Sequence, residues 1–135
     1  MAEFDTPGHT SVISKSYPEH VACVELSPWS TYAAEPPSGQ LRIASAETTN
    51  FTTGLVDALS SMFNPKYISL GGDDELNEKC YTDDIETQTD LNSTGKSFND
   101  ALNDFTAATH SVVRNAGKTP VVWEQMVLDF NVSTV

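Results

Sequence analysis

Three consecutive carboxylates are the feature of this sequence that most directly suggests chemistry. Residues 71–75 read Gly-Gly-Asp-Asp-Glu, which places Asp73, Asp74 and Glu75 directly behind two glycines. Crowded carboxylates raise one another's pKa, and a raised pKa suits a general acid that works near neutral pH. A solvated acidic turn is the simpler interpretation of the same residues, so the triplet alone leaves both interpretations open.

Two further segments carry side chains that suit a binding cleft. His9 follows Pro7 and Gly8, and a histidine at such a turn can orient or recharge a carboxylate, although a lone histidine is more often structural. Trp123 stands before Glu124, and its ring can belong to the core or stack against the face of a sugar. Both alternatives remain open for each residue.

Composition and missing motifs exclude several other functions. The net charge is 7 − 19 = −12, which disfavours binding to nucleic acids and to anionic membranes. No apolar run approaches the ~20 residues that a membrane span needs. The scattered histidines and distant cysteines form no zinc motif, and no phosphate-binding or dinucleotide-binding glycine loop occurs, so we predict neither a metal nor a cofactor.

The cysteines and the glycosylation sequons bear on the compartment of the protein. Cys23 and Cys80 are far apart in the chain and fit two free thiols or one disulfide equally well. Asn-x-Ser/Thr sequons begin at Asn50, Asn92 and Asn131, which favours secretion only weakly because chance alone supplies nearly as many. The acidic start of the chain is no signal peptide, so a secreted protein would need its leader upstream of Met1.

Strands and helices alternate around these segments. In chain order we expect a strand tail at 3–5, a proline-rich loop over 18–43, a helix from Thr49 or Asn50 to Asn64, a strand over 67–70, a short helix near Ile85, a helix from Ser97 to Asn115 and a strand over 121–123. Such alternation predicts parallel strands joined by right-handed crossovers. Each chemically suggestive segment then follows the carboxyl end of a strand, where α/β folds bind ligands.

Three motifs together resemble a known family. They are Glu-Phe-Asp-Thr-Pro-Gly-His-Thr at 3–10, Leu-Gly-Gly at 70–72 with the Asp-Glu that follows, and Val-Val-Trp-Glu at 121–124. In order and spacing they resemble the β-N-acetylhexosaminidases of glycoside hydrolase family 20. The resemblance implies an α/β fold that is part of a (β/α)8 TIM barrel. Residues 1–135 would be a fragment of one catalytic domain, from the end of barrel strand 3 to just past strand 5, because a whole barrel needs ~250 residues.

The resemblance also implies a reaction. Members of this family hydrolyse terminal β-linked N-acetylglucosamine or N-acetylgalactosamine on oligosaccharides and glycoconjugates, including chitin fragments. Catalysis is retaining and substrate-assisted, because the acetamido oxygen of the sugar attacks its own anomeric carbon. We expect no cofactor, a secreted or lysosome-like location, a possible homodimer of the full-length form, and no activity of this chain alone. The alternative is a non-catalytic glycan-binding protein or a degenerate hydrolase remnant.

Individual roles follow from the matched motifs. The resemblance makes Glu75 the acid/base, Asp74 the partner of the acetamide, and His9 a member of the hydrogen-bonded relay to the acid/base. In the same way Trp123 becomes one wall of the pocket around the acetamide methyl group. The resemblance also implies that Asp5 and Glu124 bind substrate. It implies a Cys23–Cys80 disulfide as well, which some family members have.

The chain departs from the family pattern at two positions. The family has one Asp before the Glu, whereas this chain has both Asp73 and Asp74. The usual five-residue step from the Glu to the Cys is kept between Glu75 and Cys80, so we assign Asp73 as the insertion. Ser69 stands where a histidine often precedes the Leu-Gly-Gly motif. One added residue in extended backbone moves its neighbours by about 3.3 Å, a shift that catalysis tolerates poorly.

Overall fold

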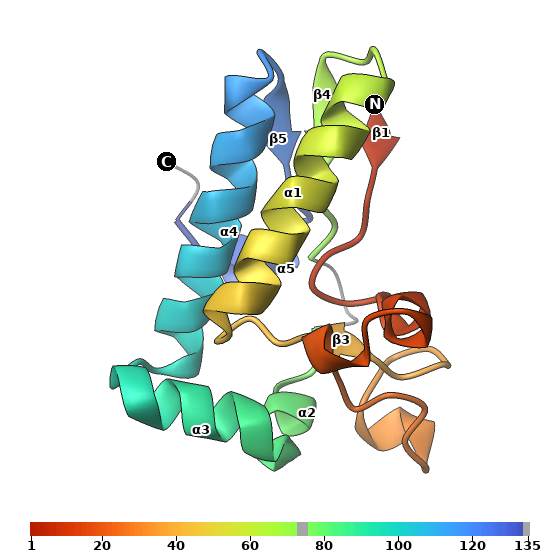
Figure 1. The fold of residues 1–135 in the computed structure, drawn as a ribbon, viewed down its shortest axis with the longest axis vertical. Coiled ribbons are helices and arrows are strands. Elements are labelled where there is room, and N and C mark those ends of the chain that lie inside the picture. Colours follow the sequence, from red (N-terminus) through yellow and green to blue (C-terminus); the bar gives the residue numbers. More distant parts are fainter. Residues whose placement is uncertain (73–75, 134–135) are drawn as a thin grey trace.

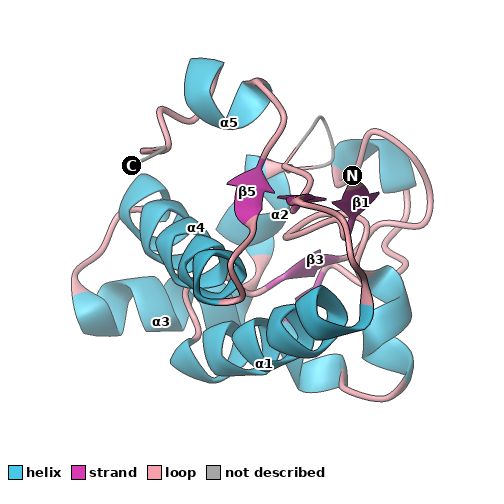
Figure 2. Ribbon diagram, turned by 90° about the horizontal axis from the view of Figure 1, so that it is seen from above, coloured by secondary structure: helices cyan, strands magenta, loops and turns pink. Residues whose placement is uncertain are grey.

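A three-stranded parallel sheet with helices on one face organises the chain. The computed structural model describes residues 1–72 and 76–133. The strands β1 (Ala2–Glu3), β4 (Tyr67–Ser69) and β5 (Thr119–Val121) lie in the order β1-β4-β5. The long helices α1 (Ala46–Met62) and α4 (Phe98–Asn115) pack against each other and cover one face of the sheet (Figures 1 and 2). The predicted α/β fold with parallel strands is therefore confirmed.

The two faces of the sheet differ in character because side chains alternate along a strand. Phe4, Ile68 and Leu70 belong to an apolar cluster that lies beneath the helices. Glu3 pairs in register with Ser69, so both of these residues belong to the opposite, helix-free face. Glu3 is exposed on this second face, where a ligand could reach it, whereas Ser69 is buried.

Helix α1 begins earlier than the sequence suggested. Its N-cap is Ser45, whose hydroxyl accepts a hydrogen bond from the backbone N–H of Thr48, so the predicted start at Thr49 or Asn50 is wrong by about one turn. The end before Asn64-Pro65 is as expected. Hydroxyl side chains dominate the buried face of this helix, and the Thr52 hydroxyl donates to the Thr48 carbonyl oxygen at 2.8 Å. The Thr52 hydroxyl is satisfied by the backbone of α1, and the Thr48 hydroxyl lies 3.1 Å from Nδ1 of His20. These small side chains allow close packing of α1 on its neighbours.

Helix α4 matches the prediction. Ser97 and Asp100 form a reciprocal capping box at its start, and Gly117, at φ +73°, follows its end. Leu102, Phe105 and Val113 are buried along its inner face. The inner face of α4 combines these apolar side chains with the buried polar residues Thr106, Thr109 and His110.

Short elements fill the segments between the long ones. Listed in chain order, they are the 3-10 helices η1 (Ser11–Lys15), η2 (Pro18–His20) and η3 (Trp29–Thr31), the antiparallel pair β2 (Val21–Ala22) and β3 (Gln40–Leu41), and the helices α2 (Glu78–Asp83), α3 (Ile85–Thr94) and α5 (Gln125–Leu128). The proline-rich segment is thus loop-like, as predicted, and the helix expected near Ile85 is present. None of the helices in the described ranges is long and apolar enough to cross a membrane.

Candidate active site

The carboxyl ends of the three parallel strands bring candidate residues together. The backbone N–H of Trp123, after β5, donates to the carbonyl oxygen of Gly71, after β4, at 3.0 Å. A Cβ atom on Gly71 would lie 2.9 Å from both Cα and Oδ1 of Asp5, which follows β1. The sequence-predicted residues Asp5 and Trp123 therefore lie on either side of the same glycine. Asp73, Asp74 and Glu75 come next in the chain and lie outside the described residues.

The two glycines at 71 and 72 are needed for this close approach. Both have positive φ angles, +73° at Gly71 and +85° at Gly72, where other residues are strained. A Cβ on Gly72 would lie only 2.7 Å from Sδ of Met126, a buried residue of α5. The Gly-Gly pair thus lets the end of β4 pass between Asp5 on one side and α5 on the other.

The loop that carries His9 is tied to the sheet by hydrogen bonds. The backbone N–H and the hydroxyl of Thr6 both donate to the carbonyl oxygen of Leu70 at 2.9 Å. The carbonyl oxygen of Pro7 accepts from the N–H of Leu41 in β3 at 2.9 Å. His9 itself is exposed and adopts a φ of +54°, so its side chain is held at the surface by a well-anchored loop.

Trp123 lies at the surface of this site and is bonded to a residue that sequence reasoning missed. Its side chain is 44% exposed, which favours a binding wall over a core position. The indole Nε1 donates to Oε1 of Glu3 at 2.8 Å, across the intervening strand β4. Alternation gave a local signal, because Glu3 in β1 comes two residues before the candidate Asp5, and side chains two residues apart in extended backbone point the same way. Glu124 is exposed at the N-terminus of α5.

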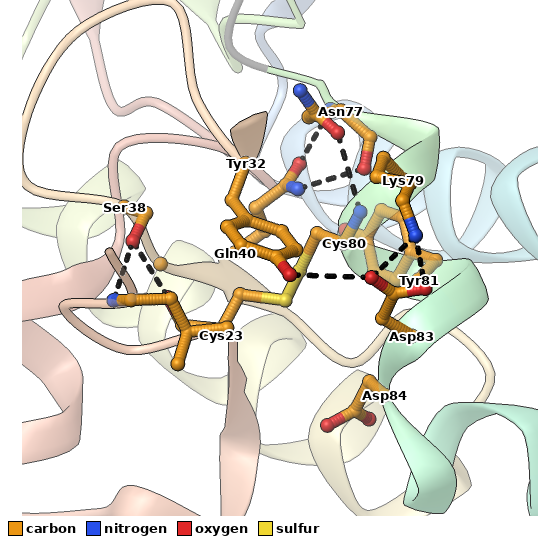
Figure 3. Close-up of a disulfide and its surroundings, with 12 residues drawn as sticks. Cys23, Tyr32, Ser38, Gln40, Asn77, Lys79, Cys80, Tyr81, Asp83 and Asp84 are labelled. Atoms are coloured by element: carbon orange, nitrogen blue, oxygen red, sulfur yellow. Dashed lines mark hydrogen bonds and ion pairs between the residues drawn. A yellow bond between two sulfur atoms is a disulfide. The ribbon is translucent and has the colours of Figure 1, made fainter. Parts of the chain in front are cut away.

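A disulfide fixes the segment that follows the three acids. Cys23 and Cys80 are bonded with their Cα atoms 5.8 Å apart, as the resemblance implied, and the free-thiol alternative is excluded (Figure 3). Cys80 is fully buried in α2, and Cys23 is 8% exposed in the loop after β2. The loop after β2 and the helix α2 are thereby covalently joined.

Two hydrogen bonds between the Gln40 side chain and the backbone of Asn77 reinforce this connection. Gln40 Nε2 donates to the carbonyl oxygen of Asn77 at 2.9 Å, and the N–H of Asn77 donates to Gln40 Oε1 at 2.8 Å (Figure 3). The Asn77 side chain also caps α2 by accepting from the N–H of Cys80 at 3.2 Å. The chain is therefore anchored two residues after Glu75.

Accessibility differs among the residues of the glycosylation sequons. Asn50, Asn92 and Asn131 are all exposed. The threonine of the first sequon, Thr52, is buried within α1. Within residues 1–72 and 76–133, no three His, Cys, Asp or Glu side chains gather in an arrangement that could hold a metal ion.

Comparisons with known proteins place these features in a family. The profile described as "Glycosyl hydrolase family 20, catalytic domain" matches residues 1–134. A β-hexosaminidase of Arthroderma benhamiae is 35% identical over 133 residues, which are 97% of this chain and 21% of the relative. Beta-hexosaminidase 1 of Coccidioides posadasii is 30% identical over 140 residues, 97% of this chain and 23% of the relative.

Solved structures agree with the sequence relatives. A chitobiase from Flavobacterium johnsoniae aligns with a TM-score of 0.69 at 25% identity, over 92% of this chain and 19% of that one. An exo-β-N-acetylglucosaminidase from Vibrio harveyi shares the fold with a TM-score of 0.72 at 19% identity, over 97% of this chain and 20% of that one. The chain spans about a fifth of the length of the curated relatives it matches. From its motifs, its sheet and these relatives together, the chain belongs to glycoside hydrolase family 20.

Proposed function

We propose that residues 1–135 form one segment of a (β/α)8 catalytic barrel, from the end of barrel strand 3 to just past strand 5. The parallel order β1-β4-β5 with α1 and α4 on one face supports this placement, because a barrel has its helices on the outside. The helix-free face that carries Glu3 and Ser69 is then the inner face. The coverage of about a fifth of each relative supports the same assignment.

The complete barrel would hydrolyse terminal, non-reducing, β-linked N-acetylhexosamine residues by substrate-assisted retaining catalysis. The observation that carries this proposal is that Asp5, Gly71 and Trp123 lie together at one sheet edge. Asp74 and Glu75 follow Gly71 in the chain by three and four residues. In this mechanism the acetamido oxygen displaces the leaving group and forms a cyclic intermediate with the anomeric carbon. Glu75 protonates the departing oxygen and then takes a proton from the water that opens the ring. Asp74 orients and polarises the acetamide throughout.

The remaining candidates would bind and orient the sugar. His9, held at the surface by its anchored loop, would hydrogen-bond in the relay that tunes the acid/base. Trp123 would present its exposed ring to the acetamide methyl group. Asp5, after β1, and Glu124, before α5, would contact sugar hydroxyls through their carboxylates. The Vibrio harveyi enzyme, which shares this fold, has been solved in complex with N-acetylglucosamine.

Exchange of the segment into a relative tests the proposal. Residues 1–135 would replace the matching segment of the Arthroderma benhamiae β-hexosaminidase, and hydrolysis of an aryl N-acetylglucosaminide would be measured. We expect turnover that falls about 10²–10⁴-fold in Glu75→Gln with substrates of poor leaving-group ability, because general acid–base catalysis contributes that much. Asp74→Asn should also be severe, and Asp73→Ala mild. A folded exchange protein without turnover would contradict the proposal, and Asp73→Ala as the most damaging change would contradict our placement of the insertion.

A non-catalytic glycan-binding role or a degenerate hydrolase is the second candidate. The extra aspartate at 73–74 favours it, because one inserted residue displaces catalytic groups. Binding of N-acetylglucosamine by the same exchange protein, with turnover absent even for activated aryl substrates, would select this alternative. The 135-residue chain by itself should show no turnover in either case, because too few strands are present to close a barrel.

The compartment and assembly follow from the same assignment. The Cys23–Cys80 disulfide fits an oxidising location, either outside the cell or in a lysosome-like compartment. Exposed sequons at Asn50, Asn92 and Asn131 would accept glycans there. The full-length form would assemble as a homodimer, and the mass of the full-length protein in solution tests this.

A further inference from the structure

Glu3 is hydrogen-bonded to Trp123 of the candidate site, but the function proposed above gives Glu3 no role. It comes from β1, whereas its partner Trp123 follows β5, 120 residues later. The bond from Nε1 to Oε1, 2.8 Å long, joins the two outer strands of the sheet. Both side chains are exposed on the helix-free face, so neither is held in place by burial.

The path of the indole ring follows from the sheet. Neighbouring strands lie about 4.8 Å apart, so β1 and β5 are about 10 Å apart with β4 between them (Figure 2). The Trp123 main chain is fixed to Gly71 of the central segment, and its ring nitrogen reaches Glu3 on the far strand. The ring must therefore extend across the end of β4. Ser69 of that strand and Gly71, which follows it, are small enough to leave room for the ring.

We propose that Glu3 is a positioning residue that sets the orientation of the Trp123 indole. Two rotatable bonds join the ring to the backbone, and the N–H is the only polar group on the ring. The hydrogen bond to Gly71 fixes the base of the residue, and the carboxylate of Glu3 fixes the far edge of the ring. A bond to an ionised acceptor is about twice as strong as a neutral one, which suits a contact at the surface.

The consequence for catalysis rests on the proposed function of Trp123 as a wall of the acetamide pocket. In substrate-assisted hydrolysis the acetamide is itself the nucleophile, so the wall that confines its methyl group controls the angle of attack. Small misplacements of reacting groups lower rates by up to about 10²-fold. Glu3 would therefore act on the rate through Trp123 without touching the sugar.

A spectroscopic experiment on the 135-residue chain tests the positioning directly. Trp29→Phe leaves Trp123 as the only tryptophan, and near-ultraviolet circular dichroism then reports how firmly its indole is held. We expect Glu3→Ala to remove most of this signal. Glu3→Gln keeps a side-chain oxygen acceptor and should retain it. Glu19→Ala, which removes another exposed carboxylate, is the matched control and should leave the signal unchanged.

Kinetics of the exchange protein test the consequence. Glu3→Ala should lower kcat about 10- to 100-fold, with a smaller change in KM, and Glu3→Gln should recover most of the loss. Trp123→Phe removes the indole N–H, so adding Glu3→Ala to it should produce little further loss. This double-mutant comparison also covers the case in which Glu3→Ala alone folds poorly, because a folding defect would persist in the Trp123→Phe background.

The outcomes separate this inference from the proposed function. An unchanged Trp123 signal in a folded Glu3→Ala chain would overturn the positioning role, whatever the activity. Equal and additive losses in the Trp123→Phe background would overturn it as well. An exchange protein without turnover would refute the proposed function, and the spectroscopic result would still decide whether Glu3 orients Trp123.

Discussion

Arg42 and Asp84 form a two-point ion pair that joins β3 to the start of α3. Arg42 Nε and Nη2 donate to the two carboxylate oxygens of Asp84 at 3.0 and 3.1 Å, and the two side chains are only 13% and 11% exposed. Burial alone would raise the pKa of Asp84, but hydrogen bonds from Arg42 and Thr87 outweigh it and hold the pKa below its ordinary value. Asp84 also caps α3 through the N–H of Thr87 at 2.9 Å. One carboxylate therefore connects the proline-rich segment to the helices that follow the three acids.

Loss of this carboxylate should destabilise the fold strongly. Asp84→Ala should lower the free energy of unfolding by about 3 kcal/mol, because Arg42 loses both bonds to the buried carboxylate and keeps its ion pair with the exposed Glu86 at 2.9 Å. Asp84→Asn should cost less, since an amide can still cap α3. Urea unfolding provides the measurement. Lys79→Ala, which breaks the exposed ion pair with Asp83, is the control and should change stability little.

The same pair fixes how stability depends on pH at the acid end. The folded pKa of Asp84 is lowered, so the unfolded chain binds the proton more readily. Its contribution is therefore complete well above the unfolded pKa of about 3.9 and is lost as the pH falls through the folded value. Stability of Asp84→Asn should depend less steeply on pH below about 4 than stability of the parent chain. Equal slopes would show that the pair does not carry the effect.

His110 should produce a second, separate pH dependence. Burial, together with the nearby Arg114 charge, lowers its pKa from 6.5 to about 4, and its Nε2 has no hydrogen-bond partner. As the pH falls, the imidazole of His110 takes up a proton in the unfolded chain before it does so in the folded chain. The free energy of unfolding should therefore fall by up to about 3 kcal/mol as the pH drops from about 6.5 towards 4. His110→Phe should flatten thermal stability across this range while Asp84 still titrates below it. A slope that survives the substitution would assign the effect to other groups.

The glycines at the end of β4 should be intolerant of a methyl group. Gly71→Ala and Gly72→Ala combine an unfavourable positive φ with contact against Asp5 or Met126, and each should destabilise by about 1–3 kcal/mol. Gly54→Ala is the matched control. Gly54 lies in α1 with no atom within 4 Å of its added Cβ, so alanine should stabilise the helix by about 0.5–1 kcal/mol. Thermal melts of the three variants give the comparison.

Reduction of the disulfide should weaken the whole structure. Cys23 and Cys80 are 57 residues apart, and chain-entropy estimates for such a loop give about 4 kcal/mol. The Cys23→Ser/Cys80→Ser double variant should unfold at correspondingly lower urea concentration. Intact mass before and after reduction, with alkylation, checks the bond itself. Two thiols that alkylate in protein kept oxidised throughout would contradict the bond.

Most of the architecture is predictable because its signals are local. The β-prone run at 67–70 indicates β4. Ser97 and Asp100, three residues apart, have the spacing of the capping box that begins α4. Each signal lies within a few residues of the element that it defines. The alternation of these elements then places Asp5 and Trp123 at one sheet edge, where the structure has them.

The parts that sequence reasoning missed depend on contacts between distant residues. An apolar pattern places the start of α1 one turn late, because the buried face of the helix is mostly hydroxyl side chains such as Thr48 and Thr52, which that pattern does not detect. Its apolar residue Met62 is instead 74% exposed. The bond between Glu3 and Trp123 crosses a strand, and no local pattern reports a partner 120 residues away.

Because of Pro120, the two edge strands of the sheet, β1 and β5, should differ in their tendency to pair with strands of other molecules. Thr119 and Trp123 direct their backbone N–H groups at β4, so the nitrogen of Pro120, in register with Ile68, lies on the outer side of β5. A proline has no N–H, and an edge strand with a missing donor is a poor template for intermolecular β-pairing. The pyrrolidine ring of Pro120 thus protects the β5 edge against amyloid-like growth. Self-association of this chain through strand pairing should therefore proceed through β1.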